Sequence, residues 1–195
     1  AAVGTRIYVV CGDAADGKPS SSVAVYSTLA GTWSPGQAFP GEPVNHPSVV
    51  AVDGKLYVFG GLERWPEPAV ADVWMYDPGA DRWTARATMP RARGAMASAV
   101  FDGKGYLMGG RRARAPAAVS PGGLIYVLGG RDRNTRSPTG VVEAFDPVRR
   151  RWLTGYAPLP TPRGGHAAAT VHGRIVVAGG EGPGGTFNQV EEYDP

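Results

Sequence analysis

Three arginines occupy the same position in successive parts of the chain and could recognise acidic groups. Arg93, Arg112 and Arg163 each precede by ten residues a glycine that belongs to a predicted hairpin turn. A guanidinium donates two parallel hydrogen bonds to a carboxylate, so these pre-turn arginines favour acidic ligands. The alternative is that they cap loops and hydrogen-bond neighbouring carbonyl groups, because most charges in loops are solvated and contribute little.

Metal-ligating and nucleophilic residues are sparse. The three histidines, His46, His166 and His172, occupy different positions relative to the hairpin turns, and Cys11 is the one cysteine. The chain has no cysteine pair for zinc, no Gly-x-Ser-x-Gly motif and no glycine-rich phosphate loop with a lysine. We therefore expect no metal site, no catalytic residue and no cofactor.

A basic stretch raises the question of nucleic acid. Residues 111–151 contain nine arginines against three acidic residues, which is an electrostatic signature of nucleic-acid binding. These arginines are divided between two loops and a turn, without interleaved exposed aromatic residues on which bases could stack. The net charge of the whole chain is +3. Nucleic acid is therefore a disfavoured partner.

The composition favours a folded all-β protein. The 195 residues include 29 glycines and 18 prolines, yet 43% are apolar and five are tryptophan. Short strands joined by many tight turns account for both properties. No apolar run approaches the roughly 18 residues of a membrane span, and the opening AAVGTRIYVV is unlike a leader peptide. One cysteine permits no internal disulfide and leaves the cellular compartment open.

Three markers recur along the chain with a period near fifty residues. An apolar segment ends in two glycines at 55–61, 104–110, 124–130 and 174–180, with a degenerate copy at 6–13. An aromatic residue followed by Asp-Pro ends the segments 73–78, 143–147 and 191–195. A tryptophan follows the aromatic residue by seven positions at Trp33, Trp83 and Trp152, and the first two tryptophans are 50 residues apart.

Each period predicts four strands. The first is a run of small apolar residues before a two-residue turn, such as Asp53-Gly54, which supports the positive φ angles of a tight hairpin. The second ends at the glycine pair. The third ends at the aromatic residue, because the proline after it cannot continue a paired strand. The fourth carries the tryptophan, which we expect to fill the space between neighbouring sheets.

GKLYVFGG, VWMYDP and the tryptophan seven residues later resemble the kelch repeat, and the resemblance covers nearly the whole chain. It implies β-propeller blades of four antiparallel strands that close into a ring around a central channel. For residues 1–195 we expect a single propeller segment, an incomplete ring of about four to five units. The predicted units are 1–40, 41–90, 91–110, 111–160 and 161–195.

The pattern is interrupted in the third unit. Gly109 and Gly129 are only 20 residues apart, so the third and fourth strands of this unit, about 30 residues, are missing. The first unit is expected to begin at a second strand and the last to stop after a third. We therefore expect a segment of a larger propeller with open sheet edges, which are prone to pair with other chains.

The resemblance also implies a binding face. In kelch proteins the connection into the first strand and the residues after the glycine pair lie on one face, which binds peptides or small ligands in several members. The matching residues here are Arg93, Arg112, Arg163, Arg111, Arg131 and Glu63. We predict a non-enzymatic interaction module for a protein or peptide partner of acidic character. The alternative is a sugar-acting enzyme similar to galactose oxidase or to a sialic-acid mutarotase, or a fragment of one.

Overall fold

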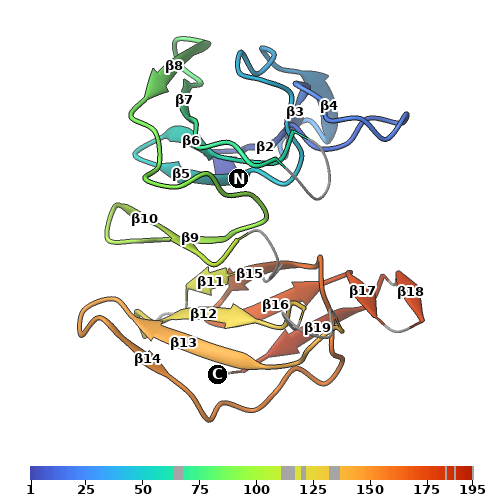
Figure 1. Cartoon of the computed structure of the whole chain (residues 1–195), viewed down its shortest axis with the longest axis vertical. Helices are drawn as coiled ribbons and strands as arrows, with labels where there is room; N and C mark the ends of the chain where they lie inside the picture. The colour runs from blue at the N-terminus through green and yellow to red at the C-terminus, as the bar shows by residue number, and fades with distance from the viewer. Residues whose placement is uncertain are drawn as a thin grey trace. The chain divides into compact units, whose positions relative to one another are not determined.

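The chain folds into antiparallel strands joined by turns and loops (Figure 1). The computed structural model describes residues 1–63, 68–110, 117–119 (backbone alone), 122–131, 137–182, 184–186 and 188–194. These residues form no helix, and thus no helix that could cross a membrane. The predicted all-β fold is confirmed. The chain divides into two compact units, Ala1–Ala95 and Met96–Pro195, and each is described by itself, so the single 1–195 segment stays a prediction.

The first unit contains two four-stranded antiparallel sheets, and in each sheet the strands follow their order in the sequence. The first sheet consists of β1 (Ala2–Val3), β2 (Arg6–Val10), β3 (Val23–Ser27) and β4 (Thr32–Pro35). The second consists of β5 (Ser48–Val52), β6 (Lys55–Phe59), β7 (Val73–Asp77) and β8 (Arg82–Arg86). These sheets are the four-stranded blades that the repeat predicts.

The second unit contains a two-stranded, a four-stranded and a three-stranded sheet, and a small hairpin. The two-stranded sheet pairs β9 (Ala97–Phe101) with β10 (Lys104–Met108). The four-stranded sheet consists of β11 (Ala117–Val119), β12 (Ile125–Leu128), β13 (Val142–Asp146) and β14 (Arg151–Leu153). The three-stranded sheet consists of β15 (Ala167–Val171), β16 (Arg174–Ala178) and β19 (Val190–Tyr193), and the hairpin of β17 (Glu181–Gly182) and β18 (Gly185–Thr186). Among the described strands β10 pairs with β9 alone, as expected for a unit without its third and fourth strands.

The start of the chain differs from the prediction that the first unit begins at a second strand. The two residues of β1 pair with β2, with Ala2 opposite Ile7 and Val3 opposite Arg6. Gly4 takes a positive φ of 56° in the turn between them. A strand of two residues is too short to show the alternating pattern by which strands are recognised in a sequence.

The hairpin turns have the predicted geometry. Asp53 and Gly54 both have positive φ angles, 49° and 72°, and His172 and Gly173 repeat this with 47° and 87°. Two consecutive residues with positive φ characterise the type I′ turn, whose twist matches that of the flanking strands. These turns set the pairing of the first strand with the second.

The third strands share one register with the second strands. The aromatic residue of the third strand always lies opposite the same apolar position. The pairs are Ile7 with Tyr26, Leu56 with Tyr76, Ile125 with Phe145 and Ile175 with Tyr193.

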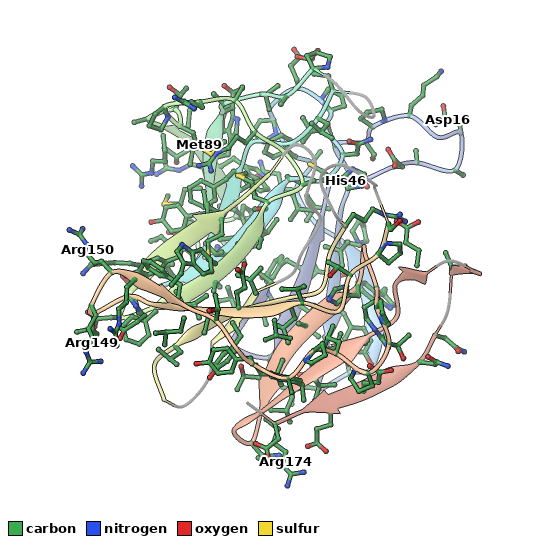
Figure 2. The ribbon with its side chains drawn as sticks, turned by 60° about the horizontal axis from the view of Figure 1, so that its bottom comes forward. Asp16, His46, Met89, Arg149, Arg150 and Arg174 are labelled. Carbon is green, nitrogen blue, oxygen red and sulfur yellow. The ribbon has the colours of Figure 1, made fainter. Side chains whose placement is uncertain are left out.

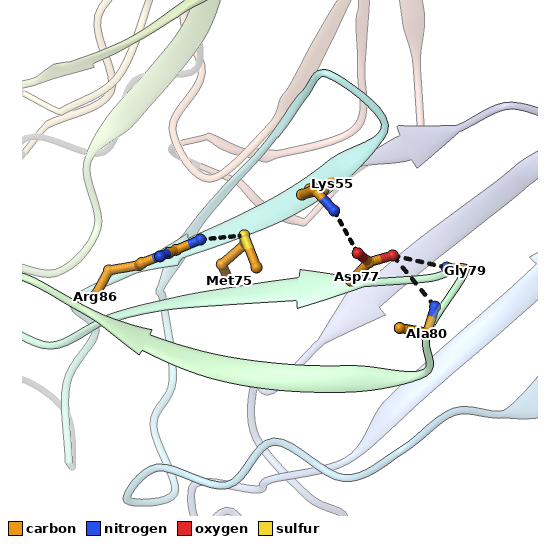
Figure 3. Close-up of polar contacts among 6 residues, drawn as sticks. All are labelled: Lys55, Met75, Asp77, Gly79, Ala80 and Arg86. Atoms are coloured by element: carbon orange, nitrogen blue, oxygen red, sulfur yellow. Dashed lines mark hydrogen bonds and ion pairs between the residues drawn. The ribbon is translucent and has the colours of Figure 1, made fainter.

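The aspartate after the aromatic residue ends the third strand by capping the following turn (Figure 3). The Oδ1 atom of Asp77 accepts hydrogen bonds from the backbone N–H groups of Gly79 at 3.0 Å and Ala80 at 3.3 Å. Its Oδ2 atom forms an ion pair with Lys55 on the neighbouring strand β6. Lys55 and these backbone groups hold the pKa of Asp77 below its usual value. The Asp-Pro marker thus combines a local turn with a contact between strands.

Each unit has its own apolar core. In the first unit the buried residues come from both sheets, and they include Tyr8, Val10, Leu56 and Val58. In the second unit the core includes Leu128, Ala144, Ile175 and Val177, all of which have no exposed surface. Burying a valine, leucine or isoleucine side chain contributes roughly 1.5–3 kcal/mol, so these alternating positions of the second and third strands stabilise the sheets.

Two of the three repeated tryptophans do not fill the space between sheets, which corrects the prediction. Trp33 is 60% exposed and Trp152 is 49% exposed. Each packs beside the aromatic residue of the third strand in its own sheet, with ring centroids 5.1 Å and 5.3 Å apart. Trp83 also contacts Phe39, at 5.4 Å, and its Nε1 donates to the carbonyl oxygen of Gln37. The fourth strand is a sheet edge, so its tryptophan is covered only where another segment reaches it.

Candidate functional site

The glycine pairs hold the loops that follow the second strands. Gly60 has a φ of +55°, and its N–H donates to the carbonyl oxygen of Asp72 at 2.9 Å. A Cβ atom on Gly60 would lie 2.0 Å from the carbonyl oxygen of Arg93, so a side chain would clash there. Cys11 occupies the equivalent position in the first sheet, with a φ of +61°. Burial raises the pKa of the Cys11 thiol to about 11, which keeps it protonated and unreactive near neutral pH.

At three places the second residue of the glycine pair, or of its degenerate copy Cys11-Gly12, forms a backbone hydrogen bond to the pre-turn position. In these three the glycine N–H donates to the carbonyl oxygen of the next pre-turn residue along the chain. The bonds join Gly12 to Val44 at 3.1 Å, Gly61 to Arg93 at 3.0 Å and Gly130 to Arg163 at 2.7 Å. The pre-turn position therefore has a structural role that its backbone performs, whichever side chain it carries.

Arg163 lies in the interior of the second unit, with no exposed surface. Its Nη1 donates to the carbonyl oxygens of Gly179 at 2.9 Å and Gln189 at 3.3 Å, and its Nε donates to that of Thr161 at 3.2 Å. Its Nη2 lies 2.7 Å from Oε1 of Glu191. Arg163 therefore matches the alternative interpretation, in which a pre-turn arginine hydrogen-bonds neighbouring carbonyl groups. A ligand could reach the guanidinium only if these contacts broke.

His166 lies in the same polar interior. It is 8% exposed. Burial and the positive charge of Arg163 lower the pKa of His166 to about 4, against smaller opposing effects of the Leu128 carbonyl and of Glu191. The imidazole is therefore neutral at pH 7.

Arg131 and Glu181 form a partly accessible ion pair on the loops that follow two glycine pairs. Nη2 of Arg131 lies 3.0 Å from Oε2 of Glu181, and the side chains are 27% and 32% exposed. Single β-bridges between Arg131 and Pro138 and between Gly164 and Glu181 hold these loops. A Cβ on Gly164 would lie 2.9 Å from Cγ of Arg131, so this glycine leaves room for the arginine side chain.

Arg93 and Glu63 lie in the first unit, around the equivalent loop. Arg93 is half-buried and its N–H donates to the carbonyl oxygen of Val70 at 3.1 Å. Glu63 is exposed and its N–H donates to the carbonyl oxygen of Pro68 at 3.0 Å. The structure thus groups the predicted residues as Arg93 with Glu63 in one unit and Arg131 with Arg163 in the other.

The remaining two predicted site residues, Arg111 and Arg112, lie outside the described residues. The six-residue binding face as a whole stays a prediction.

The acidic partners of the arginines were missed by reasoning from the sequence. Glu191 stands two residues before the aromatic residue of a third strand and meets Arg163 at the pre-turn position. In the second sheet of the first unit the same two positions hold Trp74 and Val44, an apolar combination. This paired change from charged to apolar residues is a signal that could have identified the buried ion pair. Glu181 carries no comparable signal.

The arginine cluster at 149–151 lies on the turn between β13 and β14. Arg149 and Arg150 are exposed and extend outward from that turn (Figure 2). Nη1 of Arg149 lies 3.0 Å from Oδ2 of Asp146. Backbone and side-chain hydrogen bonds from Arg149 lower the pKa of Asp146. Part of the positive charge of the basic stretch is therefore engaged locally.

The first unit also contains an open concavity of about 410 Å³. Its polar lining residues include Arg6, Ser27, Gln37, Tyr76 and Asp81. The Tyr76 hydroxyl donates to Oδ1 of Asp81 at 2.5 Å, and burial with this contact raises the pKa of Tyr76. Within the described part of the chain no three His, Cys, Asp or Glu residues are grouped so that they could hold a metal ion.

Comparisons with known proteins agree with this architecture. The kelch motif matches residues 43–90, 112–155 and 162–195. The chain is 31% identical over 241 aligned positions to the Kelch-like protein terF of Aspergillus terreus, covering all of this chain and 52% of terF. It is 31% identical over 160 positions to beta-scruin of Limulus polyphemus, covering 77% of this chain and 15% of beta-scruin.

The solved structure of YjhT has the same fold. It superposes with a TM-score of 0.77 at 13% identity, over 97% of this chain and 78% of YjhT. The chain spans about half the length of terF and a smaller part of beta-scruin. With its four-stranded antiparallel sheets, its repeated glycine pairs and the matches to the motif, this chain belongs to the kelch-motif family.

Proposed function

We propose that the protein is a non-enzymatic interaction module that binds an acidic segment of a protein partner through the loops after its glycine pairs. The observation that supports this proposal is how the backbone is attached where two of these loops begin. The N–H groups of Gly60, Gly61, Gly129 and Gly130 donate to backbone carbonyl groups, and Leu62 and Arg131 form single β-bridges. A contact residue whose backbone is already held loses less conformational entropy on binding, so its contacts contribute more to affinity.

Arg131 is the described arginine best placed to meet such a segment. Its ion pair with Glu181 is partly exposed, and a pair of this kind is worth about 0–1 kcal/mol. A ligand with several carboxylates can therefore exchange with Glu181 at little cost. Arg93 would provide the equivalent contact in the first unit, whereas Arg163 supports the loop from the interior.

The test is a titration with a fluorescently labelled octaglutamate peptide, followed by anisotropy. We expect saturable binding that weakens about threefold to tenfold in Arg131→Ala, since one charge-assisted contact is lost. Arg174→Ala is the matched control, because Arg174 lies in the same unit and also forms an exposed ion pair, with Glu192 at 3.1 Å. Equal weakening in both variants, or equal binding of octaglutamine, would refute the proposal.

A sugar-acting enzyme remains the second candidate, and the concavity of the first unit is the observation that favours it. Its lining combines a guanidinium, hydroxyl groups, an amide and a carboxylate, which are the groups that hydrogen-bond sugars. A screen for sugar oxidation and mutarotation, together with metal analysis, tests this candidate. Turnover that is lost in Tyr76→Phe would support it, and the absence of turnover with all sugars would exclude it from the screened classes.

A further inference from the structure

Among the described strands β10 pairs on one side only, with β9, whereas β2, β6, β12 and β16 each pair with a third strand on the other side (Figure 1). No residue of β10 is buried, whereas β6 buries Leu56 and Val58 and β16 buries Ile175 and Val177. The difference in burial agrees with the strand pairing, because β6 pairs with the third strand β7 and β16 pairs with the third strand β19.

The backbone polarity of this edge follows from the hairpin register. Lys104 lies opposite Phe101 across a two-residue turn, and Tyr106 lies opposite Ala99. In an antiparallel pair the N–H and C=O groups of alternate residues point to the same neighbour. Those of Lys104 and Tyr106 therefore face β9, and those of Gly105 and Leu107 face the opposite side. We call the backbone groups of Gly105 and Leu107 the outer edge of β10.

The strands that occupy the equivalent edge share a sequence pattern. In each, a valine precedes an aromatic residue by three positions: Val23 and Tyr26, Val73 and Tyr76, Val142 and Phe145, Val190 and Tyr193. Translated into the register of β10, the aromatic residue would lie opposite Gly105 and the valine opposite Met108. The other sheets have isoleucine or leucine where β10 has Gly105, so an aromatic ring would meet an open surface there.

Charge complementarity supplies the second constraint. Lys104 stands at the position of Lys55, whose ammonium group pairs with Asp77 of the neighbouring third strand (Figure 3). The Nζ atom of Lys104 lies 3.9 Å from Oδ2 of Asp102 in its own turn, and its side chain is 72% exposed. An aspartate directly after the aromatic residue of an incoming strand would lie beside Lys104, as Asp77 lies beside Lys55.

We propose that the outer edge of β10 is a docking site for an extended segment of another polypeptide with the pattern Val-x-x-aromatic-Asp-Pro. The segment binds antiparallel to β10 and forms backbone hydrogen bonds with Gly105 and Leu107. Its aromatic ring covers Gly105 and its aspartate pairs with Lys104. Addition of a strand to an exposed sheet edge is an established mode of peptide recognition. This site is separate from the glycine-pair loops, so the two proposals can fail independently.

The test uses a labelled synthetic peptide with the sequence of residues 71–82, ADVWMYDPGADR, titrated with the intact chain. Two N-methylated forms provide a matched comparison. The N–H of Trp74 faces the second strand in its own sheet and that of Met75 faces the fourth strand. We expect N-methylation at Trp74 to weaken binding at least about tenfold and N-methylation at Met75 to change it less than about threefold.

A pair of protein variants tests the charge contact without altering the core. Lys104→Gln should weaken binding of the unmodified peptide about threefold or more. Lys18→Gln is the matched control, because Lys18 is also exposed and also contacts an aspartate two residues earlier, Asp16 at 3.5 Å. It should leave binding unchanged.

Three results would overturn the proposal. One is no saturable binding up to about 1 mM peptide, the range of very weak complexes. Another is equal affinity of the two N-methylated peptides, which would place the peptide elsewhere. The third is a concentration-dependent dimer, detected by sedimentation, that Leu107→Pro abolishes, because the occupant of the edge would then be a second copy of this chain.

Discussion

Two arginines in neighbouring loops of the second unit have different roles because their environments differ. Arg163 is fully buried, donates to three backbone carbonyl groups and forms an ion pair with Glu191. Arg131 is about a quarter exposed and pairs with Glu181. A buried guanidinium must satisfy its donors within the protein, whereas one at the surface can exchange partners. Arg131 is therefore the better candidate for ligand contact.

His166 should make the stability of the protein depend on pH. Its pKa in the folded state is about 4, below the value of 6.5 that it has when exposed. The unfolded state therefore binds more protons between these values. The contribution of His166 to the free energy of unfolding is fully present above pH 6.5. It is lost as the pH falls toward 4, and this loss amounts to at most about 3 kcal/mol. Urea unfolding at a series of pH values measures this loss.

The matched variants for this prediction are His166→Gln and His172→Gln. His172 is exposed in a hairpin turn, so its replacement should leave the pH dependence unchanged. His166→Gln should flatten the dependence between pH 6.5 and 4. If both variants retain the slope of the parent protein, the carboxylates and not His166 determine it.

At the scale of the elements, the repeat determines which side chains are in contact within a sheet. Segments outside the sheet determine how far those side chains are buried. Each repeated tryptophan packs beside the aromatic residue of the adjacent third strand, with ring centroids 4.8–5.3 Å apart. Among the described residues, Trp83 alone of the three has a further aromatic neighbour outside its sheet, Phe39. Equivalent residues therefore contribute unequally to stability.

We expect Trp83→Ala to lower the free energy of unfolding by about 2 kcal/mol and Trp33→Ala to lower it by less than about 1 kcal/mol. The reason is that truncation costs most where surrounding atoms lose contacts. Trp33 is the matched control, with the same place in its sheet and 60% exposure. Chemical denaturation of both variants measures the difference. Equal losses would show that the pair within the sheet dominates and that Phe39 contributes little.

At the scale of the whole molecule, the two units have separate cores. The buried clusters of Ala1–Ala95 and of Met96–Pro195 share no residue. In repeat proteins each repeat interacts mainly with its neighbours, so a local change is expected to act locally.

Arg163→Ala tests whether this holds. Removing the guanidinium group leaves Glu191 without its buried cationic partner. This should lower the free energy of unfolding of the second unit by about 3 kcal/mol. Hydrogen exchange should accelerate in β15, β16 and β19 and stay unchanged in β5 to β8. Arg174→Ala, which removes an exposed ion pair, should change neither region. Acceleration throughout both units would show that the chain unfolds as one cooperative block.

The sequence by itself determined the strand order, the hairpin turns and the missing strands of the third unit. These features depend on local chemistry that repeats: Asp53-Gly54 adopts positive φ angles, proline ends the third strand, and Gly60 avoids a clash with a backbone oxygen. A period near fifty residues makes each signal visible several times, and the family follows from it.

The tertiary structure decided which of the repeated residues are accessible. Nothing in the local sequence distinguishes Arg163 in the interior from an arginine at the surface, or Trp83 from Trp33. Burial depends on which segments, distant in the chain, fold over a position, as Phe39 covers Trp83 and Glu191 meets Arg163. Phe39 belongs to the connection between two sheets, so a repeat pattern that describes one sheet at a time does not contain its contact with Trp83. The contact between Glu191 and Arg163 lies within one repeat, and only the paired change relative to Trp74 and Val44 indicates it.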